Sequence, residues 1–101
     1  MSLPIGKGDT GTASITETVL TLGNSGDYAK KCSVRNNGSN IIHALVNCSA
    51  STLETEFAAG RTIAIPGSGN SFLFESEGAG EIHSVAYRTD TGTSGFYIAA
   101  Y

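Results

Sequence analysis

A chain of 101 residues holds one hydrophobic core, since two half-length units would each need metals or disulfides to be stable. Hydrophobic residues make up 40% of the chain and charged residues 15%, with 13 glycines; this composition excludes an extended disordered chain and favours a sheet protein rich in turns. The net charge is −3 with only six Lys and Arg, which argues against nucleic-acid binding, and no apolar run approaches the ~20 residues of a membrane-spanning helix. We therefore expect neither a nucleic acid nor a membrane among the partners.

The chain starts with a segment of low hydrophobicity. Residues 1–11 contain Pro4 and three glycines, and we interpret them as a flexible N-terminal arm. Its first three residues could derive from an expression vector. The segment lacks the apolar stretch of a secretory signal. Residues 6–11 match the dinucleotide fingerprint G-x-G-x-x-G, but that site needs a preceding strand and a following helix, and a β-rich run follows here. We expect no phosphate site in the arm.

Residues 12–101 divide into short runs of strand-forming residues separated by Gly, Asn, Asp and Ser. Residues 49–56 resemble a helical turn, but the pattern is not sustained, so we predict no helix. Pro66 ends one run, because proline cannot donate to a ladder. The expected strands are 13–22, 27–35, 40–48, 61–65, 71–75, 82–89 and 96–101. The sequence predicts a single all-β domain, an antiparallel β-sandwich of jelly-roll type with seven to eight short strands.

The apolar residues of these runs define the predicted core. The run 40–48 is apolar on both faces, as in a central strand that is covered on both sides. The other runs contribute alternate residues to one face. The core candidates are Val34, Ile42, Leu45, Val46, Ile63, Phe72, Phe74, Ile82, Phe96 and Ile98.

The dipeptide Asn37-Gly38 between two strand-like runs predicts a tight β-hairpin. A two- or three-residue turn would place Cys32 opposite His43 or Ala44. Cys48 would then lie too far along the partner strand to form a disulfide with Cys32. We expect two free thiols, as in a cytoplasmic protein, with a bond across the sandwich as the alternative.

The same cysteines and histidines allow two further arrangements. Cys32, Cys48, His43 and His83 could form a zinc site, and Cys32 beside His43 could form a nucleophile–base pair. The sequence has neither the paired spacing of structural zinc ligands nor a third group to orient the base. We therefore predict no catalytic residue, no metal ligand and no cofactor.

The tyrosines are the candidates for an interaction surface. On the last strand Tyr97 and Tyr101 share one face, and Phe96 and Ile98 occupy the other, which has the character of a core. An outward row of tyrosines suits a subunit interface or the stacking of sugar rings. Alternatively, these are partly exposed tyrosines without a partner. The predicted interface or ligand residues are Tyr97, Tyr101, Tyr87 and Tyr28.

Two segments carry a resemblance to a known group of proteins. Residues 32–40, Cys-Ser-Val-Arg-Asn-Asn-Gly-Ser-Asn, resemble the V-x-N-x-G-S-N opening of small β-sandwich proteins encoded in phage structural gene clusters. Residues 57–65 are similar to the second element of that pattern, an Ala-Ala-Gly turn into an Ile-rich strand. The resemblance covers about residues 31–74, and the segment 77–101 is longer than the pattern's final hairpin. It implies a capsid, head–tail or tail-associated component that forms a symmetric oligomer, and it carries no catalytic residues.

These observations lead to one functional prediction with two alternatives. We expect a non-enzymatic structural protein that associates with itself or with other virion proteins, located in the virion if the phage resemblance holds and in the cytoplasm otherwise. The first alternative is a carbohydrate-binding module that uses the surface tyrosines. The second is a small metal- or thiol-dependent enzyme, which would need both cysteines and a histidine in contact.

Overall fold

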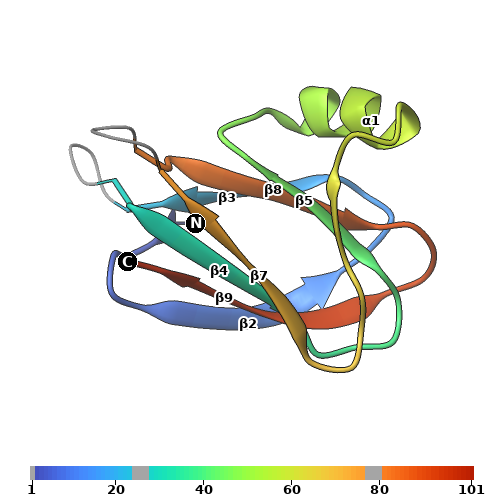
Figure 1. The fold of residues 1–101 in the computed structure, drawn as a ribbon, viewed down its shortest axis with the longest axis horizontal. Helices are drawn as coiled ribbons and strands as arrows, with labels where there is room; N and C mark the ends of the chain where they lie inside the picture. The colour runs from blue at the N-terminus through green and yellow to red at the C-terminus, as the bar shows by residue number, and fades with distance from the viewer. Residues whose placement is uncertain (1, 24–27, 77–80) are drawn as a thin grey trace.

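The computed structural model describes residues 2–23, 28–76 and 81–101. Two β-sheets face each other and enclose one core (Figure 1). The turn predicted at 77–80, and all but the first residue of the turn predicted at 23–26, lie outside the described residues. Within the described part of the chain, no helix combines the length and the apolar character needed to cross a membrane.

Sheet A has the strand order β1-β3-β8-β5-β6, and sheet B has the order β2-β9-β4-β7. The strands of sheet A are β1 (Ser2–Leu3), β3 (Thr18–Leu22), β8 (Ser84–Thr89), β5 (Ile42–Val46) and β6 (Ile63–Ile65). Those of sheet B are β2 (Gly8–Ala13), β9 (Ser94–Ala100), β4 (Lys31–Asn36) and β7 (Asn70–Glu75). One helix, α1 (Ala50–Ala58), connects β5 to β6. All paired neighbours run antiparallel except β1 and β3, which are parallel.

The strand pairs are nested around α1. Going outward from the helix, β5 pairs with β6, β4 with β7, β3 with β8 and β2 with β9. Successive pairs alternate between sheet A and sheet B, so the chain is one long antiparallel hairpin rolled into a sandwich. This is the topology of a jelly roll, and it confirms the predicted fold class. The two-residue strand β1 adds a short parallel edge to the eight strands of the roll.

The core lies between the sheets and takes alternate residues from each strand. Of the predicted core residues, Val34, Ile42, Phe74, Ile82, Phe96 and Ile98 are buried, and Val46 and Ile63 pack against them. Leu45 instead faces the other side of sheet A, where α1 lies, and is half-buried. The prediction for Phe72 is wrong: it is 39% exposed, because it lies on β7, an edge strand.

The N-terminal residues do not form the expected arm. Strand β2 pairs with β9 along its whole length, and Leu3 of β1 is buried in the core. The low hydrophobicity of β2 misled the prediction, because its glycines make room for neighbouring rings. A Cβ atom at Gly11 would lie 2.6 Å from the Phe96 ring, and one at Gly8 would collide with the Tyr97 hydroxyl. Aromatic residues of β9 thus cover a strand that has little apolar surface of its own.

Helix α1 was also not predicted. Ser49 caps its start, where the side-chain oxygen accepts a hydrogen bond from the Thr52 amide at 3.2 Å. Gly60, with φ +74°, follows its end, and the Arg61 amide donates to the Glu56 carbonyl at 2.9 Å, which completes a Schellman motif. The helix contacts β5 and β8, and these contacts rather than its own weak amphipathic pattern stabilise it.

The predicted hairpin between β4 and β5 is wrong, because the two strands belong to different sheets. The reason is Asn36, the fully buried last residue of β4. Its Nδ2 donates to the Asn40 carbonyl at 2.6 Å and to the Ile65 carbonyl at 2.8 Å. Its Oδ1 accepts from the Gly38 amide at 3.1 Å and from the Ser94 hydroxyl at 2.6 Å. Asn36 therefore fixes a corner through which the chain crosses from sheet B to sheet A.

Candidate functional site

Cys32 and His43 do not form the pair that the predicted hairpin would have brought together. Cys32 is fully buried between the sheets and lies opposite Phe74 and Ala100, not opposite His43. Burial raises the pKa of the Cys32 thiol to about 12, so the thiol is protonated at neutral pH and is a poor nucleophile. Cys48 is half-buried, and both thiols are free, as the sequence predicted.

The two histidines lie in separate surroundings. His43 points to the outer side of sheet A, where its Nδ1 lies 2.8 Å from the Thr62 hydroxyl and its ring meets Phe57 edge-on at 4.7 Å between centroids. The ring of His83 contacts Tyr28 edge-on at 4.1 Å. Within residues 2–23, 28–76 and 81–101, no group of three His, Cys, Asp or Glu side chains is placed to hold a metal ion.

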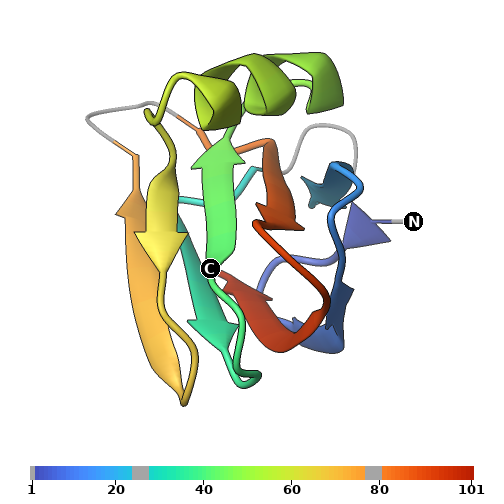
Figure 2. The ribbon, with the colours of Figure 1, turned by 90° about the vertical axis from the view of Figure 1, so that its right-hand side faces the viewer.

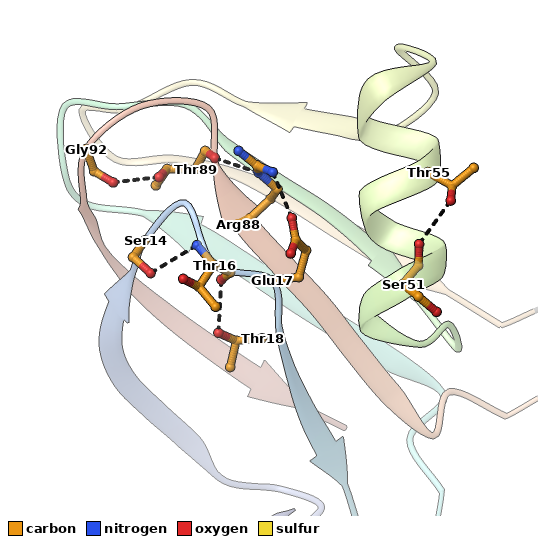
Figure 3. Close-up of polar contacts among 9 residues, drawn as sticks. All are labelled: Ser14, Thr16, Glu17, Thr18, Ser51, Thr55, Arg88, Thr89 and Gly92. Atoms are coloured by element: carbon orange, nitrogen blue, oxygen red, sulfur yellow. Dashed lines mark hydrogen bonds and ion pairs between the residues drawn. The ribbon is translucent and has the colours of Figure 1, made fainter.

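Arg88 is the centre of a polar cluster on the outer side of sheet A (Figure 3). Its Nη1 lies 2.7 Å from a Glu17 carboxylate oxygen, and its Nε donates to the Thr89 carbonyl at 2.9 Å. Its guanidinium also lies over the Phe57 ring of α1, 3.9 Å from the ring centroid. Arg88 thus joins β8, α1 and the turn before β3, with both charged side chains largely withdrawn from solvent.

The neighbouring hydroxyl groups in this cluster are engaged with backbone groups close to them in sequence. The Ser14 hydroxyl accepts from the Thr16 amide at 3.3 Å, and the Thr18 hydroxyl donates to the Thr16 carbonyl at 3.2 Å. The Thr89 hydroxyl donates to the Gly92 carbonyl at 2.7 Å (Figure 3). These bonds shape the two turns and engage the Ser14, Thr18 and Thr89 hydroxyls with the backbone, so we assign the cluster a structural role.

The outer face of sheet B is different, because none of the described elements covers it, whereas α1 covers part of sheet A (Figure 1). Tyr97 and Tyr101 point outward from this face and are 40% and 56% exposed. The Tyr97 side chain lies across Gly8 of the neighbouring strand. Ala99, between the two tyrosines, is buried. The sequence correctly placed this pair on the outside of the last strand.

A hollow of about 680 Å³ lies at one end of this face, lined by Lys30, Lys31, Ser33, Leu73 and Tyr101. Leu73 is a residue that the sequence did not single out. It is 43% exposed on β7, and together with Phe72 it forms an apolar edge of sheet B. The alternation of β7 shows which residues share a face but not that the strand lies at an edge, so this feature depends on the strand order.

The other two candidate tyrosines do not join this surface. Tyr87 is 8% exposed and packs edge-to-face on Phe96 in the core, with 4.8 Å between ring centroids. Burial and the nearby Asp9 carboxylate raise the pKa of Tyr87. Tyr28 is exposed, but its ring contacts His83. Of the four candidate tyrosines, only Tyr97 and Tyr101 therefore lie exposed on the outer face of sheet B.

No protein-family model, no curated protein and no solved structure matches this chain.

Proposed function

We propose that this chain is a non-enzymatic structural protein that associates with further copies of itself through sheet B. One observation carries the proposal: four of the eight exposed large hydrophobic side chains in the described part of the chain belong to this sheet or directly follow it. They are Phe72, Leu73, Tyr97 and Tyr101. Leu73 and Tyr101 also line one hollow on this sheet. Exposed apolar surface favours an interaction site, and tyrosine is enriched in interfaces.

The setting that we propose for this assembly is a phage virion. The jelly roll is a fold of viral capsid domains, and it also occurs in lectins. The fold therefore supports a virion setting by analogy. The resemblance of residues 32–40 and 57–65 to phage structural proteins points in the same direction. In the structure residues 32–40 form most of β4 and the Asn36 corner, and residues 57–65 form the end of α1 and the whole of β6. We infer that they act in the fold rather than in binding. Genes for capsid or portal proteins next to its own gene would support this setting.

The solution mass tests self-association directly. The chain mass is 10.4 kDa. We expect light scattering after gel filtration to show an oligomer whose mass is a multiple of this value. The fraction of chains in the oligomer should increase with protein concentration. A strict monomer at millimolar concentration would contradict the proposal, because an interface used for assembly has to form in that range.

A carbohydrate-binding module is the second candidate, and the position of Tyr97 favours it. A ring that lies across a glycine presents a flat surface, as sugar stacking requires. Here we expect Tyr97→Ala combined with Tyr101→Ala to abolish binding on a glycan array, while Tyr28→Ala, on a separate surface, leaves it intact. An array without signal for the wild-type chain would exclude this candidate.

A further inference from the structure

Strand β7 is the long apolar edge of the molecule. No described strand lies on its outer side, and in Figure 2 it is the outermost strand on the left. The edges of sheet A are only two and three residues long, and the opposite edge of sheet B, β2, has the polar sequence Gly-Asp-Thr-Gly-Thr-Ala. Strand β7 has six residues, Asn-Ser-Phe-Leu-Phe-Glu, without the lysine or proline that proteins place on edges to prevent pairing.

The hydrogen-bond alternation of the ladder shows which backbone groups β7 leaves free. The Ser76 amide donates to the Lys30 carbonyl at 2.9 Å, in continuation of the register that pairs Lys31 with Glu75. Bonded pairs alternate with non-bonded pairs in an antiparallel ladder, so residues 72 and 74 also bond to β4. The amides and carbonyls of Ser71, Leu73 and Glu75 therefore point to the free edge.

We propose that β7 pairs antiparallel with β7 of a second copy of this chain, about a twofold axis at Leu73, so that the two B sheets form one continuous sheet. This inference rests on the proposed self-association and names its interface. A twofold interface brings the same surface of both copies together, and an edge strand is complementary to itself when it pairs antiparallel. With Leu73 at the centre, Ser71 of each copy faces Glu75 of the other. All three residues with free backbone groups then obtain partners.

The side chains favour the same register. On the core side, Phe72 of each copy meets Phe74 of the other, which would cover the exposed Phe72 ring. On the outer side, Leu73 meets its own copy, and no two like charges face each other. A register centred on Glu75 would bring two carboxylates together. One centred on Ser71 would pair Leu73 with Gly69, whose φ of +89° takes it out of the strand.

Proline substitution separates the edge from the fold. Because the Leu73 amide points away from β4, Leu73→Pro removes no hydrogen bond within the chain, but it blocks pairing at the centre of the interface. Thr10→Pro is the matched control. The register of β2 with β9 and the Ala100 amide bonded to the Lys7 carbonyl leave the Thr10 amide on the opposite free edge of the same sheet. Leu73→Lys is the second variant, since it brings two like charges together on the twofold axis.

Sedimentation velocity of the four chains tests the inference. We expect both Leu73 variants to weaken self-association by at least about 100-fold and to keep the far-ultraviolet spectrum of the wild type, while Thr10→Pro associates normally. If the wild type associates and the Leu73→Lys chain associates equally well, the β7 interface is wrong, and self-association through another part of sheet B still stands. If the wild type is monomeric at every concentration, the proposed function fails together with the interface.

Discussion

Replacement of Asn36 by alanine tests whether the corner between the sheets determines the stability of the jelly roll. The side chain is fully buried and makes four hydrogen bonds, two as donor and two as acceptor. Alanine would leave the carbonyls of Asn40 and Ile65, the amide of Gly38 and the hydroxyl of Ser94 without these partners, and the bonds to Ile65 and Ser94 are buried. At a net contribution of about 1 kcal/mol for each bond, the variant should lose about 4 kcal/mol of unfolding free energy.

This loss is large for a domain of this size. Total stabilities are about 5–15 kcal/mol, and 1 kcal/mol corresponds to roughly 4–8 °C in Tm for a domain of about 100 residues. Asn36→Ala should therefore melt about 15–30 °C below the wild type. Asn36→Asp should be at least as unstable at neutral pH, because a carboxylate oxygen replaces the amide donor opposite two carbonyls. Burial would raise the pKa of this new carboxyl, so its deficit should shrink as the pH falls and it becomes protonated.

Urea denaturation followed by circular dichroism measures these differences, with Asn37→Ala at the exposed neighbouring position as the control. The control should lie within about 0.5 kcal/mol of the wild type. A loss below about 1 kcal/mol for Asn36→Ala would refute the reasoning, since it would mean that the four bonds are not needed to join the sheets.

Three further predictions concern the polar and sulfur-containing groups. A thiol reagent should modify Cys48 in the native protein and Cys32 only after unfolding, because Cys32 is buried and its pKa is about 12; equal rates would contradict this. Glu17→Gln should lower the free energy of unfolding by about 1–3 kcal/mol, since it leaves the largely buried guanidinium of Arg88 without its carboxylate. A urea denaturation midpoint equal to that of the wild type would contradict this. Burial and Arg88 lower the pKa of His43 against the opposing effect of Asp90, so the unfolded chain binds the proton more tightly. The free energy of unfolding should thus decrease as the pH falls below about 6.5, and it should decrease less in the His43→Gln variant. An identical pH dependence in the wild type and the variant would exclude the effect.

Much of the sandwich could be predicted because alternation is a local property. It identified the buried faces of β4 and β9, and it placed Tyr97 and Tyr101 on the outside of the last strand. The elements that were missed derive their stability from other parts of the chain. Strand β2 is covered by the rings of Phe96 and Tyr97, and α1 becomes stable on the sheet that lies beneath it.

The local signals also failed where two of them competed. The Asn37-Gly38 dipeptide is typical of a tight hairpin. The preceding Asn36 side chain instead hydrogen-bonds backbone groups of the turn, and the chain crosses to the other sheet. Tyr87 was placed among the surface candidates because alternation does not show which face of a strand is covered. The free edge at Leu73 follows only from the strand order, which depends on contacts between residues far apart in the sequence.

Amide hydrogen exchange along β7 tests the central claim most directly, because the odd- and even-numbered residues of one strand report on different partners. In a dilute sample the amides of residues 72 and 74 should be protected by β4, while those of Ser71, Leu73 and Glu75 exchange rapidly. Above the association concentration, we expect all five amides to be protected. Continued rapid exchange at Ser71, Leu73 and Glu75 in the associated protein would show that this edge is not where the copies meet.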